Sequence, residues 1–118
     1  MPQPAAYPAV AGGKLIGVNV HAGPANYTQV IPGNPVAGGD LVYASEFPFG
    51  QGIDWLSTAV SDDGAYLALP IFNNTQTGSN RGSQSSVTVK YLVVATMAEV
   101  AAAANLSARS FRFLATGQ

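Results

Sequence analysis

Charged side chains are scarce in this chain, and their scarcity limits the kind of surface that any fold of it can present. Asp, Glu, Lys and Arg together make up 9 % of the 118 residues, whereas an ordinary soluble domain has about 25 %. Charge keeps soluble monomers apart in solution. A chain with so little charge suits a protein whose surface is largely covered by neighbouring subunits.

The remaining composition narrows the class of protein. The length suits one domain, and 47 % hydrophobic residues favour a folded core over disorder. Because the chain has no Cys, disulfides, thiolate catalysis and sulfur-ligated metals are excluded. Its five cationic residues are scattered and form no basic stripe. We therefore expect no nucleic-acid partner, no membrane partner, no metal and no cofactor.

Residues 1–13 (MPQPAAYPAVAGG) are uncharged and show neither a helical nor a strand period. Their prolines favour an extended course. We expect an extended N-terminal arm that lies on its own domain or on a neighbour, followed by a single β domain over residues 14–118. The predicted contact residues of the arm are Pro4, Tyr7 and Val10. No signal peptide or transmembrane segment is expected, because the N-terminus lacks a cationic region and the chain lacks a long apolar run.

Short β-prone runs separated by turn residues predict a mainly β fold. In the run 14–20, Ile16, Val18 and Val20 share one face, and in the run 109–115 we expect Phe111 and Phe113 to point inward and Arg112 outward. The best strand is 87–96, whose second half predicts a central strand covered on both sides. Further strands are expected over 26–31 and 41–46, and a hairpin over 53–72 with its turn at Ser61-Asp62-Asp63-Gly64.

One short helix is expected near 97–105. Thr96-Met97-Ala98-Glu99 has the pattern of a capping box, in which Thr96 and Glu99 would satisfy the first helical amides. Met97, Val100, Ala101 and Ala104 would form its apolar stripe. With about seven strands, these elements predict an antiparallel sandwich or a partly closed barrel.

Two segments are candidates for contacts with other molecules. Phe47 and Phe49 lie in a Gly- and Pro-rich loop near Trp55, where the three aromatic residues either pin the loop to the core or anchor a neighbouring subunit. Residues 73–86 are polar, hold one charge and predict an exposed loop. Its candidate contact residues include Asn73, Asn74, Asn80 and Arg81.

Other motifs have less specific interpretations. His21 is the only imidazole, and a capping or interface hydrogen bond is favoured over catalysis because no Gly-x-Ser-x-Gly elbow accompanies it. Asp62 and Asp63 favour a turn over a calcium site. Asp54 beside Trp55 suggests a sugar contact, against which we favour an outward Asp54 and a buried Trp55.

This Cys-free, charge-poor composition, with a Pro-rich N-terminus, Ala-, Gly-, Val- and Thr-rich strands and a polar loop, resembles small structural proteins of tailed bacteriophage virions, especially capsid decoration (cement) proteins. The resemblance implies a non-enzymatic protein of the virion, assembled in the host cytoplasm, that forms a homo-oligomer, often a trimer, and clamps major capsid subunits. A glycan- or receptor-binding β module of a tail fibre or adhesin is the alternative. A small hydrolase or isomerase that depends on His21 is disfavoured.

Overall fold

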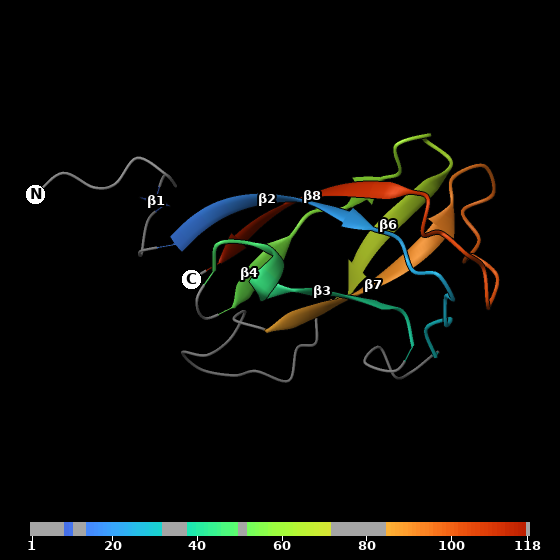
Figure 1. The fold of residues 1–118 in the computed structure, drawn as a ribbon, viewed down its shortest axis with the longest axis horizontal. Helices are drawn as coiled ribbons and strands as arrows, with labels where there is room; N and C mark the ends of the chain where they lie inside the picture. Colours follow the sequence, from blue (N-terminus) through green and yellow to red (C-terminus); the bar gives the residue numbers. More distant parts are fainter. Residues whose placement is uncertain (1–8, 11–13, 32–37, 50–51, 72–84, 118) are drawn as a thin grey trace, which may run out of the picture.

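The computed structural model describes residues 9–10, 14–31, 38–49, 52–71 and 85–117. These residues form two four-stranded antiparallel sheets (Figure 1), ordered β1-β2-β8-β4 and β3-β7-β6-β5. The predicted mainly β class is confirmed. In chain order, the described strands and the 3-10 turn η2 are β1 (Ala9–Val10), β2 (Lys14–Ala22), β3 (Asp40–Tyr43), η2 (Ala44–Glu46), β4 (Ile53–Leu56), β5 (Ala59–Val60), β6 (Tyr66–Ile71), β7 (Ser86–Val93) and β8 (Ser110–Gly117).

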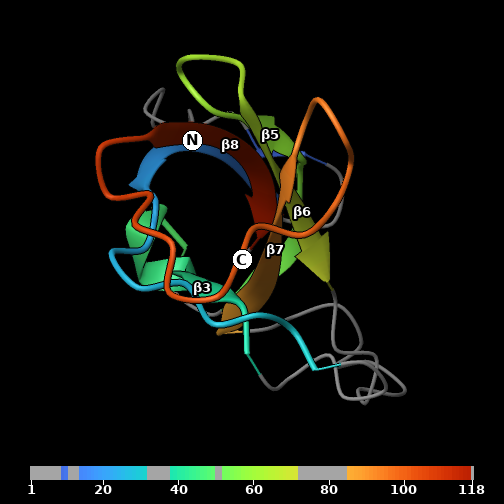
Figure 2. The ribbon, with the colours of Figure 1, turned by 90° about the vertical axis from the view of Figure 1, so that its right-hand side faces the viewer.

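Backbone pairing joins the two sheets along the edge that β4 and β5 form beside β8. β4 pairs with β8 in the first sheet, and β5 pairs with β6 in the second. Between them, the Ser57 N–H donates to the Leu114 carbonyl at 2.8 Å. At the opposite edge, no backbone ladder joins β2 to β3 among the described strands. Strands β2 and β8 curl into a half-barrel (Figure 2). The half-barrel is open where β2 faces β3 and η2, and we call this open edge the seam.

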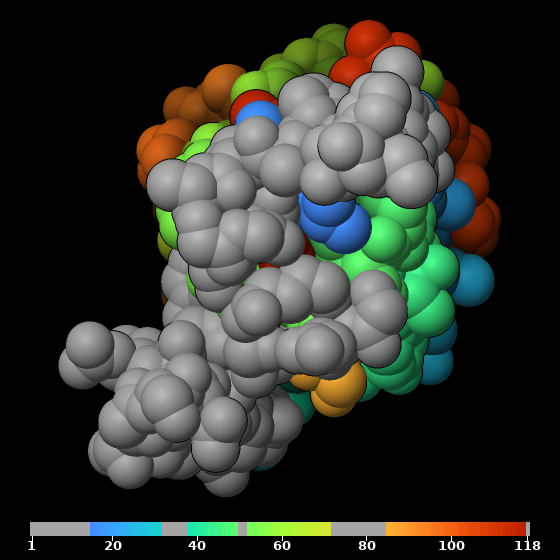
Figure 3. All heavy atoms as spheres, turned by 90° about the vertical axis from the view of Figure 1, so that its left-hand side faces the viewer, coloured from blue at the N-terminus to red at the C-terminus, as the bar shows by residue number. Residues whose placement is uncertain are grey.

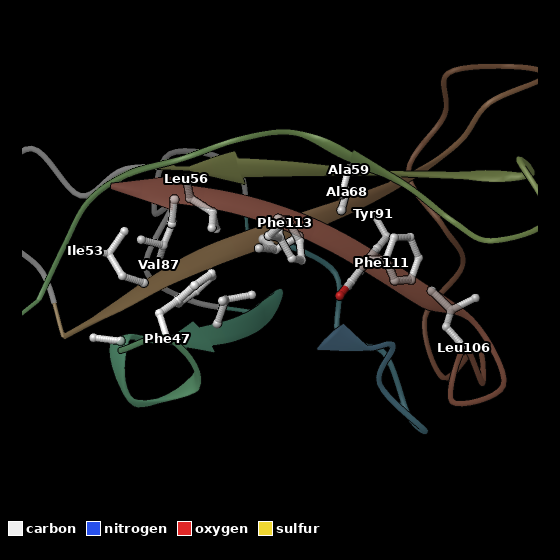
Figure 4. Close-up of a cluster of buried hydrophobic side chains, with 14 of the residues drawn as sticks. Phe47, Ile53, Leu56, Ala59, Ala68, Val87, Tyr91, Leu106, Phe111 and Phe113 are labelled. Atoms are coloured by element: carbon white, nitrogen blue, oxygen red, sulfur yellow. The ribbon is translucent and has the colours of Figure 1, made fainter. Parts of the chain in front are cut away.

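The hydrophobic core fills the space between the sheets. Strand β8 alternates as predicted: Phe111 and Phe113 are fully buried, whereas Arg112 and Leu114 are exposed. Figure 4 shows the Phe111 ring beside Tyr91 of β7, with Phe113 further along β8. Tyr91 and Phe111 approach to 4.8 Å between ring centroids. Aromatic rings at this spacing contribute attraction beyond the area that they bury.

The apolar face of β2 exists as predicted, and it points to solvent. Val18 and Val20 are 60 % and 55 % exposed, while Gly17 is buried on the opposite face. A Cβ on Gly17 would come within 3.1 Å of Pro48 Cδ, so the absence of a side chain lets the segment after η2 pack against β2. The end view in Figure 3 shows the start of β2 (blue) against this green segment.

The helix expected near 97–105 is wrong. Met97 and Ala103 have positive φ values of 59° and 67°, which interrupt any helix there. The chain instead folds back on β7, and the Val93 N–H donates to the Ala98 carbonyl at 2.8 Å. Glu99 does not cap a helix, because its Oε2 accepts hydrogen bonds from the Tyr27 hydroxyl and the Val30 N–H, both at 2.8 Å. A helix this short has little stability of its own, so these long-range partners decide the conformation.

Four strand predictions need adjustment. Residues 26–30 form an irregular segment rather than a strand, with Tyr27 buried and its N–H bonded to the Ala104 carbonyl at 3.0 Å. The hairpin over 53–72 is confirmed only in part: β5 pairs with β6 across the expected turn at 61–64, whereas β4, the first half of the expected arm, pairs with β8 in the other sheet. The third expected strand ends at Tyr43, and η2 follows it. The best strand, β7, is central as predicted, but it ends at Val93.

Candidate functional site

A cluster of polar side chains bridges the seam at His21 of β2. The Nε2 atom of His21 lies 2.8 Å from Oδ2 of Asp40 in β3, and its Nδ1 atom lies 2.7 Å from Oε1 of Glu46 in η2. The His21 side chain is 12 % exposed. The imidazole is therefore held between two carboxylates from the opposite side of the seam.

Local structure explains how these three side chains meet. Along β2, period-two alternation turns Asn19 and His21 to the face opposite that of the exposed Val18 and Val20. β3 begins at Asp40, directly after Gly39, whose φ of +76° turns the chain. Glu46 is fixed by η2, because its Oε2 accepts a hydrogen bond from the Tyr43 N–H at 2.8 Å.

Both carboxylates receive further hydrogen bonds from neutral donors. Asn19 Nδ2 donates to Glu46 Oε1 at 2.9 Å, and the Tyr91 hydroxyl donates to Asp40 Oδ2 at 2.8 Å. The imidazole can donate to both carboxylates at once only when both of its ring nitrogens carry a proton, and only the imidazolium form has two N–H groups.

The electrostatic balance at His21 agrees with this protonation. Burial is the largest single influence and lowers the pKa of His21. The hydrogen bonds and negative charges of Asp40 and Glu46 together outweigh burial and raise the pKa above its usual value near 6.5. Burial also raises the pKa of the Tyr91 hydroxyl, so that it stays a hydrogen-bond donor to Asp40 across the ordinary pH range.

Through His21, this arrangement links β2 of the first sheet to β3 of the second sheet and to η2. Both nitrogens of His21 are occupied by carboxylates, so neither has a lone pair available to take a proton from a substrate. Within the described part of the chain, no group of three or more His, Cys, Asp or Glu residues is placed to hold a metal ion. A hydrogen-bonding role for His21 was expected from sequence. Its partners were not, because they lie 19 and 25 residues away on other elements.

A second candidate is the solvent side of the first sheet, which we call the outer face. Across β2 and β8, Val18 pairs with Leu114 and Val20 with Arg112, while Trp55 of β4 pairs with Thr116 of β8. A pocket of about 290 Å³ lies at one end and includes Val60, Asp62 and Ser110 in its lining. The exposed apolar side chains of the outer face are Val18, Val20, Trp55 and Leu114, and Val60 of β5 adjoins them at the pocket; each is between 44 % and 60 % exposed.

The aromatic residues predicted as interface anchors divide between core and surface. Phe47 and Phe49 are buried, at 5 % and 6 % exposed, and their rings stack at 5.3 Å. We therefore correct the prediction that these two residues anchor a neighbouring subunit. Their rings pack into the core of this chain and leave little surface for a partner. Trp55 is 49 % exposed. This reverses the expected arrangement, since β4 bulges between Ile53 and Trp55 and the Asp54 carboxylate oxygens are buried.

The other predicted site residues are placed only in part. Val10 lies in β1, opposite Lys14 of β2. Asp63 belongs to a turn, as expected: its Oδ1 accepts from the Ser61 hydroxyl at 2.6 Å, and Arg109 lies 2.7 Å from Oδ2. The hydrogen bond from Ser61 is the first of several contacts that lower the pKa of Asp63. Pro4, Tyr7, Asn73, Asn74, Asn80 and Arg81 lie outside the described residues.

Comparison of the chain with protein-family models, curated proteins and solved structures gives no match. Over the described ranges, no helix has the length and apolar character needed to cross a membrane.

Proposed function

We propose that this protein is a non-enzymatic structural protein of a virion, and that it binds and stabilises a protein shell in the manner of a capsid decoration protein. Its partners would be the major capsid protein or another virion protein together with further copies of this chain, in a trimer by preference. Neither nucleic acid nor membrane is a partner in this proposal, and the protein would reside in the virion.

The observation that carries the proposal is the outer face. Val18 and Leu114 stand side by side on neighbouring strands, with Val20 and Trp55 on the same side of the sheet. Each of these side chains is at least 44 % exposed in the isolated chain. A contiguous exposed apolar patch marks an interaction surface more often than a free one. Shell subunits are partners that would remove this patch from water permanently.

Charge supports the same conclusion. With 9 % charged residues, the chain has little of the electrostatic repulsion that keeps free proteins apart. Arg112 is exposed within the outer face, opposite Val20, and can pair with a carboxylate of a neighbouring subunit. Binding only to the assembled shell would stabilise that shell by mass action.

Val18→Glu tests the proposal, because it places an acidic side chain in the middle of the outer face. We expect the variant to lose binding to shells of the encoding virus that lack the protein, since a buried unpartnered carboxylate costs several kcal/mol, about 3–5 in comparable cases. The measurement is co-sedimentation of purified protein with such shells. Val94→Glu is the matched control, because Val94 is 40 % exposed but lies beyond the end of β7.

Circular dichroism of both variants checks that the β fold is retained. Full binding by Val18→Glu, or equal loss in both variants, would contradict a role for the outer face.

Exposure of Trp55 favours a second candidate, a glycan- or receptor-binding module. An exposed indole ring can stack on a sugar, and Trp55 is the only tryptophan of the chain. Its fluorescence therefore reports contacts at this site alone. A saturable change during oligosaccharide titration would favour this function, and a constant signal would disfavour it.

A further inference from the structure

We propose that the protonated His21 side chain is a proton-controlled clasp: it holds β2 to β3 and η2 across the open seam, and loss of its proton releases this edge of the barrel. The inference does not depend on the proposed shell role. It rests on the two carboxylate contacts of one ring and on the lack of a backbone ladder between the strands that the ring connects.

The clasp lies between two contacts of a different kind. Toward the start of β2, Gly17 packs closely against Phe47 and Pro48. Beyond the end of β2, the loop that leads to β3 is closed by a hydrogen bond from the Gly39 N–H to the Thr28 carbonyl at 2.7 Å. Between these points, His21 and Asn19 make side-chain hydrogen bonds across the seam to the facing carboxylates of Asp40 and Glu46.

Deprotonation changes the balance of charge in the seam. A neutral imidazole has one N–H, so it can donate to Asp40 or to Glu46 but not to both. The other ring nitrogen would then direct a lone pair at a carboxylate. Other groups facing the ring offer no replacement cation: they are the Tyr91 hydroxyl from β7, the Asn19 amide from β2 and the Phe113 ring from β8. Among the described residues, neither carboxylate has an ion pair with Lys or Arg.

The sign of the pH dependence follows from the raised pKa of His21. The proton is bound more tightly in the folded protein than in the unfolded chain, whose imidazole titrates near 6.5. The stabilisation by the clasp is therefore complete below about pH 6.5 and is lost as the pH rises through the pKa of the folded state. We expect the seam to open on the alkaline side.

Nuclear magnetic resonance of the untagged protein tests the clasp directly, because His21 is the only histidine of the chain. With ¹⁵N-labelled histidine, we expect both ring nitrogens to be protonated at pH 6 and to titrate above the usual value. Amide hydrogen exchange, corrected for its intrinsic pH dependence, should then show a several-fold loss of protection in residues 16–22 over the same pH range. The amides of β6 are the internal control and should keep their protection.

Two variants separate the clasp from a general effect on folding. His21→Gln leaves one neutral amide donor in place of the imidazolium. The amide protection of residues 16–22 should therefore be low at both ends of the pH range in this variant. Glu46→Gln should lower the pKa of His21 relative to the native chain. Should His21 titrate at or below its usual value, or should β2 keep its protection across the titration in the native chain, the clasp is overturned, whatever the variants do.

Discussion

Phe113→Ala is expected to lower the free energy of unfolding by about 3–5 kcal/mol, the range typical of a phenylalanine removed from a closed core. Phe113 has no exposed surface, and the centroid of its ring lies 5.9 Å from that of His21 in a T-shaped arrangement. It therefore supports both the core and the inner side of the seam. Since the free energy of unfolding of a small domain is only about 5–15 kcal/mol, this loss is a large part of the total stability. Urea denaturation followed by circular dichroism measures it.

Leu114→Ala is the matched control for Phe113→Ala, because it removes a large side chain one residue further along β8. Leu114 is 44 % exposed on the outer face, so its truncation in the isolated chain should cost less than about 1 kcal/mol. A shift of β8 by one residue would exchange the two faces. Similar losses in the two variants, or a larger loss for Leu114→Ala, would therefore contradict the register of β8 between β2 and β4.

Gly38→Ala is expected to be strongly destabilising, and Gly64→Ala only moderately so. The two glycines have nearly the same positive φ, +78° and +77°, so alanine meets a similar strain of about 1–2 kcal/mol from this angle at both. They differ in surroundings. A Cβ on Gly38 would lie 2.0 Å from the Gln29 carbonyl oxygen, whereas nothing lies within 4 Å of a Cβ on Gly64.

The difference between the two alanine variants isolates this steric conflict. We expect Gly38→Ala to lose roughly 1–3 kcal/mol more than Gly64→Ala, because the backbone of the segment before β3 must move. The midpoints of urea denaturation give the comparison. Equal midpoints would mean that residues 28–31 do not lie against Gly38 as described.

The sequence predicted those strands in which alternating apolar and polar residues define the two faces by themselves. On β8, the order of Phe111, Arg112 and Phe113 defines a buried and an exposed face without knowledge of any neighbour. The same holds for the alternation of β2, although its pattern did not reveal which face meets water. Val18 and Val20 point outward because the glycine between Ile16 and Val18 admits the loop of Phe47 on the other side.

Long-range partners explain what the sequence did not predict. Thr96 and Glu99 have the spacing of a capping box, yet the Glu99 carboxylate accepts a hydrogen bond from the hydroxyl of Tyr27, 72 residues away. The segment 53–60 alternates like one hairpin arm, but its two halves pair with β8 and β6. The clasp was missed for the same reason, because no spacing in the sequence brings His21 near Asp40 and Glu46.

Hydroxyl-radical footprinting tests most directly whether neighbouring protein chains cover the outer face. Trp55 and Met97 are reactive residues that are 49 % and 58 % exposed in the isolated chain, the first on the outer face and the second in the turn after β7. In the native assembly, we expect Trp55 to be protected several-fold relative to the diluted chain, while Met97 is modified at the same rate in both. Equal modification of Trp55 in the assembly and in the diluted chain would contradict the account.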